Sequence, residues 1–287
     1  MISRRRLMWS VATSVTAAVG YPTQVEPRWL DKTTTRVSLG GLNRVSCRIL
    51  HLSDLHASWV VPLDMIDRAI ESGLSANPDI VCVTGDFITS RYDYDARAYA
   101  ATLRRLSATR PTFAVLGNHD GGVWAKERRG SADHVAVSRM LEDAGITLLH
   151  NRSQKLKLRQ GRLTLVGVGD LWSREIDADR AFRSVAPGGP VVLLSHNPDS
   201  KDVLARWHWD LMLCGHTHGG QVIIPFEGPR YAPVQDKRFV AGLHPWRGRQ
   251  IYTTRGVGNH MGVRFMCRPE VSVLDIESHG RGGSAHV

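Results

Sequence analysis

The sequence predicts an α/β fold in which parallel strands come first and further strands are added late in the chain. Between residues 45 and 206, short apolar runs typical of buried strands alternate with segments that carry apolar residues at helical spacing. After residue 210 the pattern changes to short strands separated by turns containing Gly and Pro. Of the 287 residues, 42% are hydrophobic and 22% charged, which is typical of a soluble globular protein that needs no disulfide bonds for stability.

Each expected element follows from a local pattern. The clearest helix begins at Pro62, because apolar residues then recur at helical spacing from Leu63 to Leu74. Another expected helix ends at Gly145, the residue type that most often follows a helix's last turn. No internal repeat is present. The expected strands are 47–52, 79–84, 112–116, 163–167, 191–195, 211–214, 221–224, 250–253 and 270–276, and the expected helices are 62–75, 96–106, 131–144 and 199–206.

Positive charge is concentrated near the N-terminus. The formal net charge is +10, and the first fifty residues hold eight Lys and Arg against two acidic residues, which is +6 and leaves +4 for the rest. A mildly basic body argues against nucleic acid as the main partner. A basic N-terminal segment suits an anionic membrane surface or a targeting signal. The four cysteines form no CxxC pair, so we expect buried free thiols rather than disulfides or a zinc knuckle.

The N-terminal segment has the order of an export signal. A basic start precedes an apolar stretch over 7–20, which is shorter than the ~20 residues that a membrane span needs. The segment Ser3-Arg4-Arg5-Arg6-Leu7-Met8 resembles a twin-arginine signal, which predicts the periplasm or the inner-membrane surface, with the cytoplasmic membrane face as the alternative. We therefore expect a signal or anchor and basic lead-in over 1–44, a folded domain over 45–278 and a disordered tail over 279–287.

Polar residues of ligand type follow the ends of five expected strands. Open α/β sheets bind ligands at the carboxyl ends of their strands, where residues distant in sequence meet. Chance would scatter Asp, Asn and His over both ends of these strands, so the pattern predicts a site at one edge. The residues are Asp54 and His56, then Asp86, then Asn118, His119 and Asp120, then His196, and finally His216 and His218.

This set of side chains predicts metal binding. It holds three carboxylates, one amide and five imidazoles, a mixture of nitrogen and oxygen donors that suits Mn, Fe, Zn or Ni. The number of ligands favours two divalent or mixed-valence ions over one. A carboxylate that reaches both ions holds them about 3.5–4 Å apart, the spacing used in attack at phosphorus.

The motifs that carry these residues resemble the calcineurin-like metallophosphoesterase superfamily. They are Asp54-Leu55-His56, Gly85-Asp86, Gly117-Asn118-His119-Asp120, His196 and Gly215-His216-Thr217-His218, in that order. The resemblance runs from about residue 48 to 276, so it identifies 45–278 as a metallophosphoesterase domain. Segments such as "SHNPDSKDV" and "DLMLCGHTHGGQ" resemble the bacterial YaeI-type phosphodiesterases, which are related to UDP-2,3-diacylglucosamine pyrophosphatases.

The resemblance implies a fold, a reaction and a role for each motif residue. The fold is a sandwich of two mixed β-sheets flanked by helices, and the reaction is attack of a metal-bridging hydroxide on a phosphodiester or pyrophosphate bond. His119 is the implied general acid or phosphoryl donor, and Asp120 orients it. The implied ligands are Asp54, His56 and His218 for the first ion, Asn118, His196 and His216 for the second, and Asp86 for both.

Several alternatives stay open at this point. The substrate is a phosphodiester or a nucleotide-lipid such as UDP-2,3-diacylglucosamine, and a non-catalytic metal-binding scaffold is the other class of function. Arg255, in a glycine-rich loop, either contacts a substrate phosphate or serves the loop's structure. Asp170 is either a residue supporting the ligands or unrelated to them. The segment 59–62 either forms an apolar lip for an acyl chain or packs into the core, and His134, His150 and His260 are interpreted as surface or structural residues.

Overall fold

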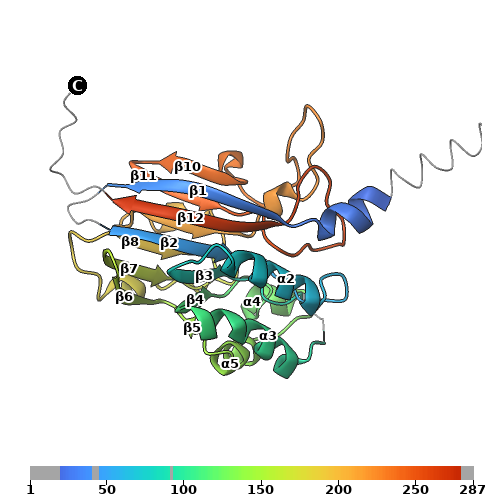
Figure 1. Ribbon diagram of the computed structural model, residues 1–287, viewed down its shortest axis with the longest axis horizontal. Helices are drawn as coiled ribbons and strands as arrows, with labels where there is room; N and C mark the ends of the chain where they lie inside the picture. The colour runs from blue at the N-terminus through green and yellow to red at the C-terminus, as the bar shows by residue number, and fades with distance from the viewer. Residues whose placement is uncertain (1–19, 41–44, 91–92, 279–287) are drawn as a thin grey trace, which may run out of the picture.

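The computed structural model describes residues 20–40, 45–90 and 93–278, and in it two six-stranded sheets pack face to face (Figure 1). The first sheet has the order β1-β12-β2-β3-β4-β5 and the second has the order β10-β11-β9-β8-β7-β6. The strands are β1 (Asp31–Leu39), β2 (Val45–Leu52), β3 (Ile80–Thr84), β4 (Thr112–Val115), β5 (Thr147–Leu148), β6 (Arg152–Leu158), β7 (Gly161–Gly167), β8 (Val191–Leu194), β9 (Leu211–Cys214), β10 (Gly242–Trp246), β11 (Arg249–Thr253) and β12 (Glu270–Ser278).

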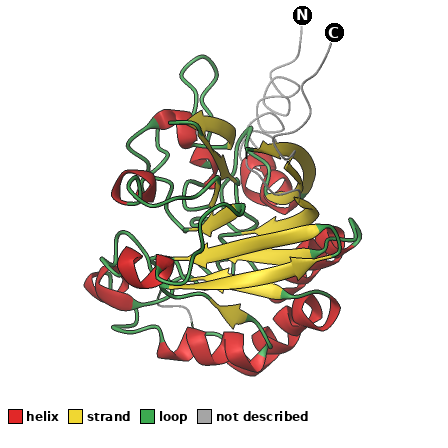
Figure 2. Ribbon diagram, turned by 90° about the vertical axis from the view of Figure 1, so that its left-hand side faces the viewer, coloured by secondary structure: helices red, strands yellow, loops and turns green. Residues whose placement is uncertain are grey.

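Helices cover the outer face of each sheet, so the domain has four layers (Figures 1 and 2). One core lies between the first sheet and its long helices, a second lies between the two sheets, and a third lies outside the second sheet around Trp209. The helices are α2 (Leu63–Leu74), α3 (Ala96–Thr109), α4 (Gly122–Glu127), α5 (Val135–Asp143), α6 (Ala178–Phe182) and α7 (Ser200–Val203), with short turns η1 (Tyr21–Val25), η2 (Glu26–Arg28), η3 (His218–Gly220) and η4 (Lys237–Phe239).

This architecture confirms the predicted α/β class and the sandwich of two mixed sheets. In the first sheet, β2, β3, β4 and β5 are successive parallel neighbours. In the second sheet, β7, β8, β9 and β11 are successive parallel neighbours. The antiparallel pairs are β12 with β2, β6 with β7 and β10 with β11. The strand expected over 221–224 is wrong, because Val222 and Ile224 make only isolated bridges. All four cysteines are buried and free, as expected.

The expected lead-in contributes a strand to the domain. Residues Asp31–Leu39 form β1 and pair in parallel with β12 along their whole length, so the sheet begins before residue 45. The expected signal over the first nineteen residues and the expected tail over 279–287 lie outside the described residues. Among the described residues, no helix combines the length and the apolar character that a membrane crossing requires.

The arrangement of the strands brings the predicted ligands to one edge of the molecule. β2, β3 and β4 are parallel neighbours in the first sheet, and β8 and β9 are parallel neighbours in the second. Their carboxyl ends lead into the loops that carry Asp54, Asp86, Asn118, His196 and His216. Because the two sheets face each other, these five loops converge at a single rim.

Candidate dinuclear metal centre

The loops at this rim place their ligand-type residues in an unusual backbone conformation. Five of the predicted ligands have positive φ: Asp54, His56, Asp86, His216 and His218 at 46° to 68°. Residues other than glycine rarely adopt this region, and such conformations cost of order 1–3 kcal/mol unless the surroundings hold them. Their concentration at one rim indicates that the fold tolerates local backbone strain in order to direct these side chains toward one point.

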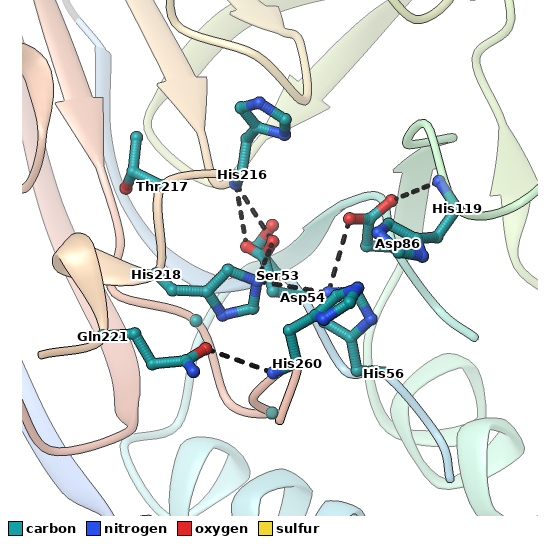
Figure 3. Close-up of polar contacts among 12 residues, drawn as sticks. Ser53, Asp54, His56, Asp86, His119, His216, Thr217, His218, Gln221 and His260 are labelled. Carbon is teal, nitrogen blue, oxygen red and sulfur yellow. Dashed lines mark hydrogen bonds and ion pairs between the residues drawn. The ribbon is translucent and has the colours of Figure 1, made fainter. Parts of the chain in front are cut away.

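Asp54, His56 and His218 form the first group of candidate ligands (Figure 3). Nε2 of His218 lies 3.4 Å from Oδ1 of Asp54 and 3.2 Å from Nε2 of His56. All three residues are buried. The carboxylate of Asp54 also accepts hydrogen bonds of 3.1 and 3.0 Å from the backbone N–H of His216, which fixes its orientation.

Asp86, His196 and His216 form the second group. Nε2 of His196 lies 3.1 Å from Oδ2 of Asp86 and 3.2 Å from Nδ1 of His216. Nδ1 of His196 lies 2.7 Å from the carbonyl oxygen of Thr84, to which only an N–H can donate. This bond places the proton of a neutral imidazole on Nδ1 and leaves Nε2 free to bind a metal.

Asp86 lies between the two groups. Its Oδ2 is 3.4 Å from Nε2 of His56 and 3.1 Å from Nε2 of His196, so a single oxygen faces one imidazole from each group. Its Oδ1 accepts a 2.9 Å hydrogen bond from the backbone N–H of His119. Asn118 lines the same cavity, and its side-chain oxygen is buried without a hydrogen-bond partner among the described residues. A buried acceptor without a donor is costly, and a cation would satisfy it.

Burial sets the electrostatics of these side chains. It raises the pKa of Asp54 to about 6 and lowers the pKa of His216 to about 3, because the interior disfavours the charged form of each. Burial also disfavours charge on His196, but the neighbouring Asp86 outweighs it and raises the pKa to about 10. Metal binding requires a neutral imidazole, so a divalent cation would displace the Nε2 proton that Asp86 stabilises on His196, and its charge would then compensate the buried carboxylates. The residues present therefore fit two metal ions.

His119 lines the cavity but is oriented by Ser90, not by Asp120. Nδ1 of His119 accepts from the backbone N–H of Ser90 at 3.3 Å and lies 3.0 Å from its hydroxyl. The carboxylate of Asp120 instead accepts from the backbone N–H groups of Phe87 at 2.7 Å and Gly117 at 2.8 Å. The predicted orienting role of Asp120 is thus wrong: its side chain joins the loop after β3 to the loop after β4.

Three aromatic residues and a histidine near the centre were not predicted from the sequence. Trp172 has its ring 4.2 Å from that of His216 and stacks on Trp124, which in turn lies 4.6 Å from His119. The ring of His260 lies 4.9 Å from that of His119, and the backbone N–H of His260 donates to Oε1 of the Gln221 side chain (Figure 3). These residues and Tyr231 line a cavity of about 350 Å³ above the ligands. The aromatic and glycine-flanked character of these loops was the only signal in the sequence.

Arg255 points away from this cavity. Its guanidinium lies 2.8 Å from Oδ2 of Asp31 and 3.2 Å from Oε2 of Glu270, and it is not among the residues that line the cavity. This geometry favours the structural interpretation of Arg255.

Asp170 is buried, and burial raises its pKa to about 6, while His196 lowers it. Asp170 therefore belongs to the surroundings of the second group. Trp59 is 84% exposed and Val61 fully buried, so the segment 59–62 forms no continuous lip on the cavity.

Comparison with known proteins agrees with the metal-ligand geometry of the centre. Residues 47–220 match the model of the Calcineurin-like phosphoesterase family. The chain is 40% identical over 278 residues to Phosphodiesterase YaeI of Escherichia coli, which covers 96% of this chain and 100% of that protein. It is 26% identical to the UDP-2,3-diacylglucosamine pyrophosphatase LpxG of Chlamydia trachomatis, which covers 79% of this chain and 82% of that protein.

A solved structure shares the fold. The NAD nucleotidase of Haemophilus influenzae superposes with a TM-score of 0.50 at 15% sequence identity, covering 75% of this chain. The chain spans 46% of the length of that structure, so the likeness concerns one part of it and the fold alone.

Proposed function

Because the chain belongs to the calcineurin-like phosphoesterase family, we propose that it hydrolyses phosphodiester or pyrophosphate bonds with two divalent or mixed-valence metal ions. The position of Asp86 is the observation that carries this proposal. One of its oxygens lies 3.4 Å from an imidazole of the first group and 3.1 Å from an imidazole of the second. A carboxylate in that position suits a bridging ligand, whereas two independent metal sites would each need their own.

The proposed ligands divide as the family resemblance implies. Asp54, His56 and His218 bind the first ion, Asn118, His196 and His216 bind the second, and Asp86 binds both. The ions are drawn from Mn, Fe, Zn and Ni, which accept imidazole and carboxylate donors. When bound, two such ions neutralise the anionic phosphodiester and activate water near neutral pH.

His119 is the proposed donor to the substrate. The backbone N–H of Ser90 can only donate, so Nδ1 of a neutral His119 accepts and its Nε2 carries the proton. Burial lowers the pKa of His119 to about 4, which keeps the ring neutral at pH 7. A neutral Nε2–H donates a hydrogen bond to a phosphoryl or leaving-group oxygen and strengthens it as charge develops there.

The cavity above the ligands favours a substrate with an apolar or aromatic group. Its walls include Trp124, Trp172, Tyr231 and Met261. Aromatic side chains provide flat apolar surface for stacking, so aryl, nucleobase and acyl groups all fit this chemistry. A nucleotide-lipid is the second candidate substrate, because the relative LpxG is named as a pyrophosphatase of UDP-2,3-diacylglucosamine.

Activity should depend on metal and on Asp86. We expect chelator-treated protein to lose hydrolysis of bis(p-nitrophenyl) phosphate and to recover it with Mn²⁺. Asp86→Asn should lower kcat/KM by more than about 100-fold, since changes to groups that merely support metal ligands cost 10–100-fold. Asp275→Asn is the matched control, because Asp275 on β12 forms a partly exposed ion pair with Arg48 on β2.

Two results would contradict the proposal. A clear preference for p-nitrophenyl phosphate over the diester would exclude a phosphodiesterase. Full activity of Asp86→Asn would exclude a bridging carboxylate. A parallel assay with UDP-2,3-diacylglucosamine, glycerophosphodiesters and cyclic nucleotides separates the nucleotide-lipid from the general diester.

We also propose export through the twin-arginine-like segment to the periplasm or the inner-membrane surface. The support is the sequence of residues 3–8 and the +6 charge of the first fifty residues. Replacement of Arg4, Arg5 and Arg6 by lysine should retain the protein in the cytoplasm, measured by fractionation of cells expressing the full chain. Periplasmic recovery of that variant would exclude this route.

A further inference from the structure

A third group of metal-ligand side chains lies outside the proposed dinuclear centre. His134, His150 and Glu175 each place one ligand atom within 4.8 Å of the others. None of the three belongs to a motif used above, and all are partly exposed. His134 precedes α5, His150 follows β5, and Glu175 lies in the loop between β7 and α6, so three separate segments meet here.

Asn151 holds two of these segments together. Its side-chain N–H donates to the carbonyl oxygen of Glu175 at 2.7 Å, and its Oδ1 accepts from the backbone N–H of Gly169 at 2.9 Å and of Asp177 at 3.0 Å. The turn that carries His150 is thereby fixed against the loop that carries Glu175. The third segment packs on Gly121, where an added Cβ would lie 2.8 Å from Cα of His134. The spacing of the group is therefore set by the backbone.

The side chains have the free ligand atoms that a metal site needs. Nδ1 of His150 is buried and has no hydrogen-bond partner among the described residues. Nδ1 of His134 lies 3.1 Å from the hydroxyl of Ser138, which leaves Nε2 of that ring available. The carboxylate of Glu175 completes a set of two imidazoles and one carboxylate.

We propose that His134, His150 and Glu175 bind a third metal ion, a zinc ion with water as its fourth ligand. Two His and one Glu are an established zinc ligand set, and imidazole donors suit Zn²⁺. In tetrahedral coordination, ligand atoms 2.0–2.1 Å from zinc lie about 3.3 Å apart. The group reaches this spacing by a small inward movement of partly exposed side chains.

The third ion would brace the aromatic wall of the substrate cavity. The loop that supplies Glu175 also carries Trp172, whose ring contacts His216, and the segment before His134 carries Trp124. A metal bond between the two segments would hold the stacked pair Trp124 and Trp172 in place. The third site is thus distinct from the reacting centre but coupled to the shape of its cavity.

The first test counts metal. Full-length protein is equilibrated with Zn²⁺, freed of excess, and its bound zinc is measured by mass spectrometry for wild type, His134→Asn, His150→Gln and the exposed control His208→Asn. We expect His134→Asn and His150→Gln to hold one equivalent fewer than wild type, and His208→Asn to match wild type. Wild-type zinc content in both variants, or an equal loss in the control, would overturn the proposal.

A second test separates this site from the dinuclear centre. In the Asp86→Asn background, which disrupts the dinuclear centre, Zn²⁺ should still slow amide hydrogen exchange over residues 168–177. Adding His134→Asn should abolish this protection. Protection that persists in the double variant excludes zinc binding at this group. A failure of the dinuclear proposal alone would leave this protection intact, so the two proposals fail independently.

Discussion

The hydroxyl of Ser90 should contribute to catalysis through His119, and its removal gives a sharp test of the site's geometry. Ser90 approaches Nδ1 of His119 twice, through its hydroxyl at 3.0 Å and through its backbone N–H at 3.3 Å. Ser90→Ala removes the shorter contact and keeps the longer one. The remaining N–H contact keeps the proton of the neutral ring on Nε2. The ring is therefore held less firmly but can still donate a hydrogen bond from Nε2.

The expected loss follows from the value of one hydrogen bond. A neutral hydrogen bond contributes about 1 kcal/mol net, which corresponds to about a 5-fold change in rate at 25 °C. Removal of the whole imidazole in His119→Ala should cost about 10²–10³-fold in kcat, the usual cost of removing one hydrogen-bond donor to the transition state. We therefore expect Ser90→Ala to fall well short of His119→Ala, and Ser90→Thr to retain most of the activity.

The assay is the kcat and KM for bis(p-nitrophenyl) phosphate, with bound metal measured in the same samples. Ser90→Ala and His119→Ala should both retain wild-type metal content, because neither Ser90 nor His119 is a proposed ligand. Thr102→Ala, which deletes a hydroxyl bonded to Ala98 within α3, is the control for a general loss of stability. A Ser90→Ala variant as slow as His119→Ala, or one indistinguishable from wild type, would refute the positioning role.

Three further changes test the rest of the site. Gly215→Ala would place a methyl group against Asp54, and we expect a loss of about 1–3 kcal/mol in stability and of metal content in the purified protein. Trp172→Ala should raise the KM for the aryl diester about 3–10-fold with little change in kcat. Burial raises the pKa of Glu270, but Arg255 and the hydrogen bonds to the carboxylate outweigh burial and hold the pKa below its usual value. The ionised carboxylate therefore stabilises the fold fully above the unfolded pKa of about 4.3, and this stabilisation is lost as the pH falls through the folded pKa. Glu270→Gln should therefore lower the free energy of unfolding at pH 7 by about 2–4 kcal/mol and flatten its dependence on pH below about 5, as measured by denaturant titration. An unchanged dependence of the unfolding free energy on pH below about 5 would contradict the pairing of Glu270 with Arg255.

Most strands that the sequence predicts carry continuous apolar runs. β3, β8 and β9 are fully buried, so every position had to be apolar or small and the pattern was plain. β1 and β6 are edge strands with one exposed face, and their sequences "DKTTTRVSL" and "RSQKLKL" carry few apolar residues. A half-exposed edge strand gives only weak alternation, which a polar loop can mimic.

The site was predictable where its residues follow strand ends and unpredictable where loops supply them. The ends of buried parallel strands must meet at one edge, so their Asp, Asn and His residues could be assigned together. Ser90, Trp172 and His260 lie in loops whose paths depend on tertiary packing. The resemblance implies that Asp120 orients His119, but neighbouring side chains in a turn point in different directions, and the carboxylate of Asp120 accepts from the backbone of Phe87 and Gly117 instead.

Backbone hydrogen bonds make the two halves of the centre depend on each other. Asp54, proposed for the first ion, accepts from the backbone N–H of His216, proposed for the second. Asp86, proposed for both, accepts from the backbone N–H of His119. Asp54 therefore restrains the loop of a proposed ligand of the second ion, and Asp86 restrains the loop that carries Asn118, another proposed ligand of that ion. Because Asp54, Asp86 and His216 all have positive φ, these bonds also hold the strained backbone that directs the side chains. The spacing of the two ligand groups is thus set by the joined loops, so neither group is expected to form correctly without the other.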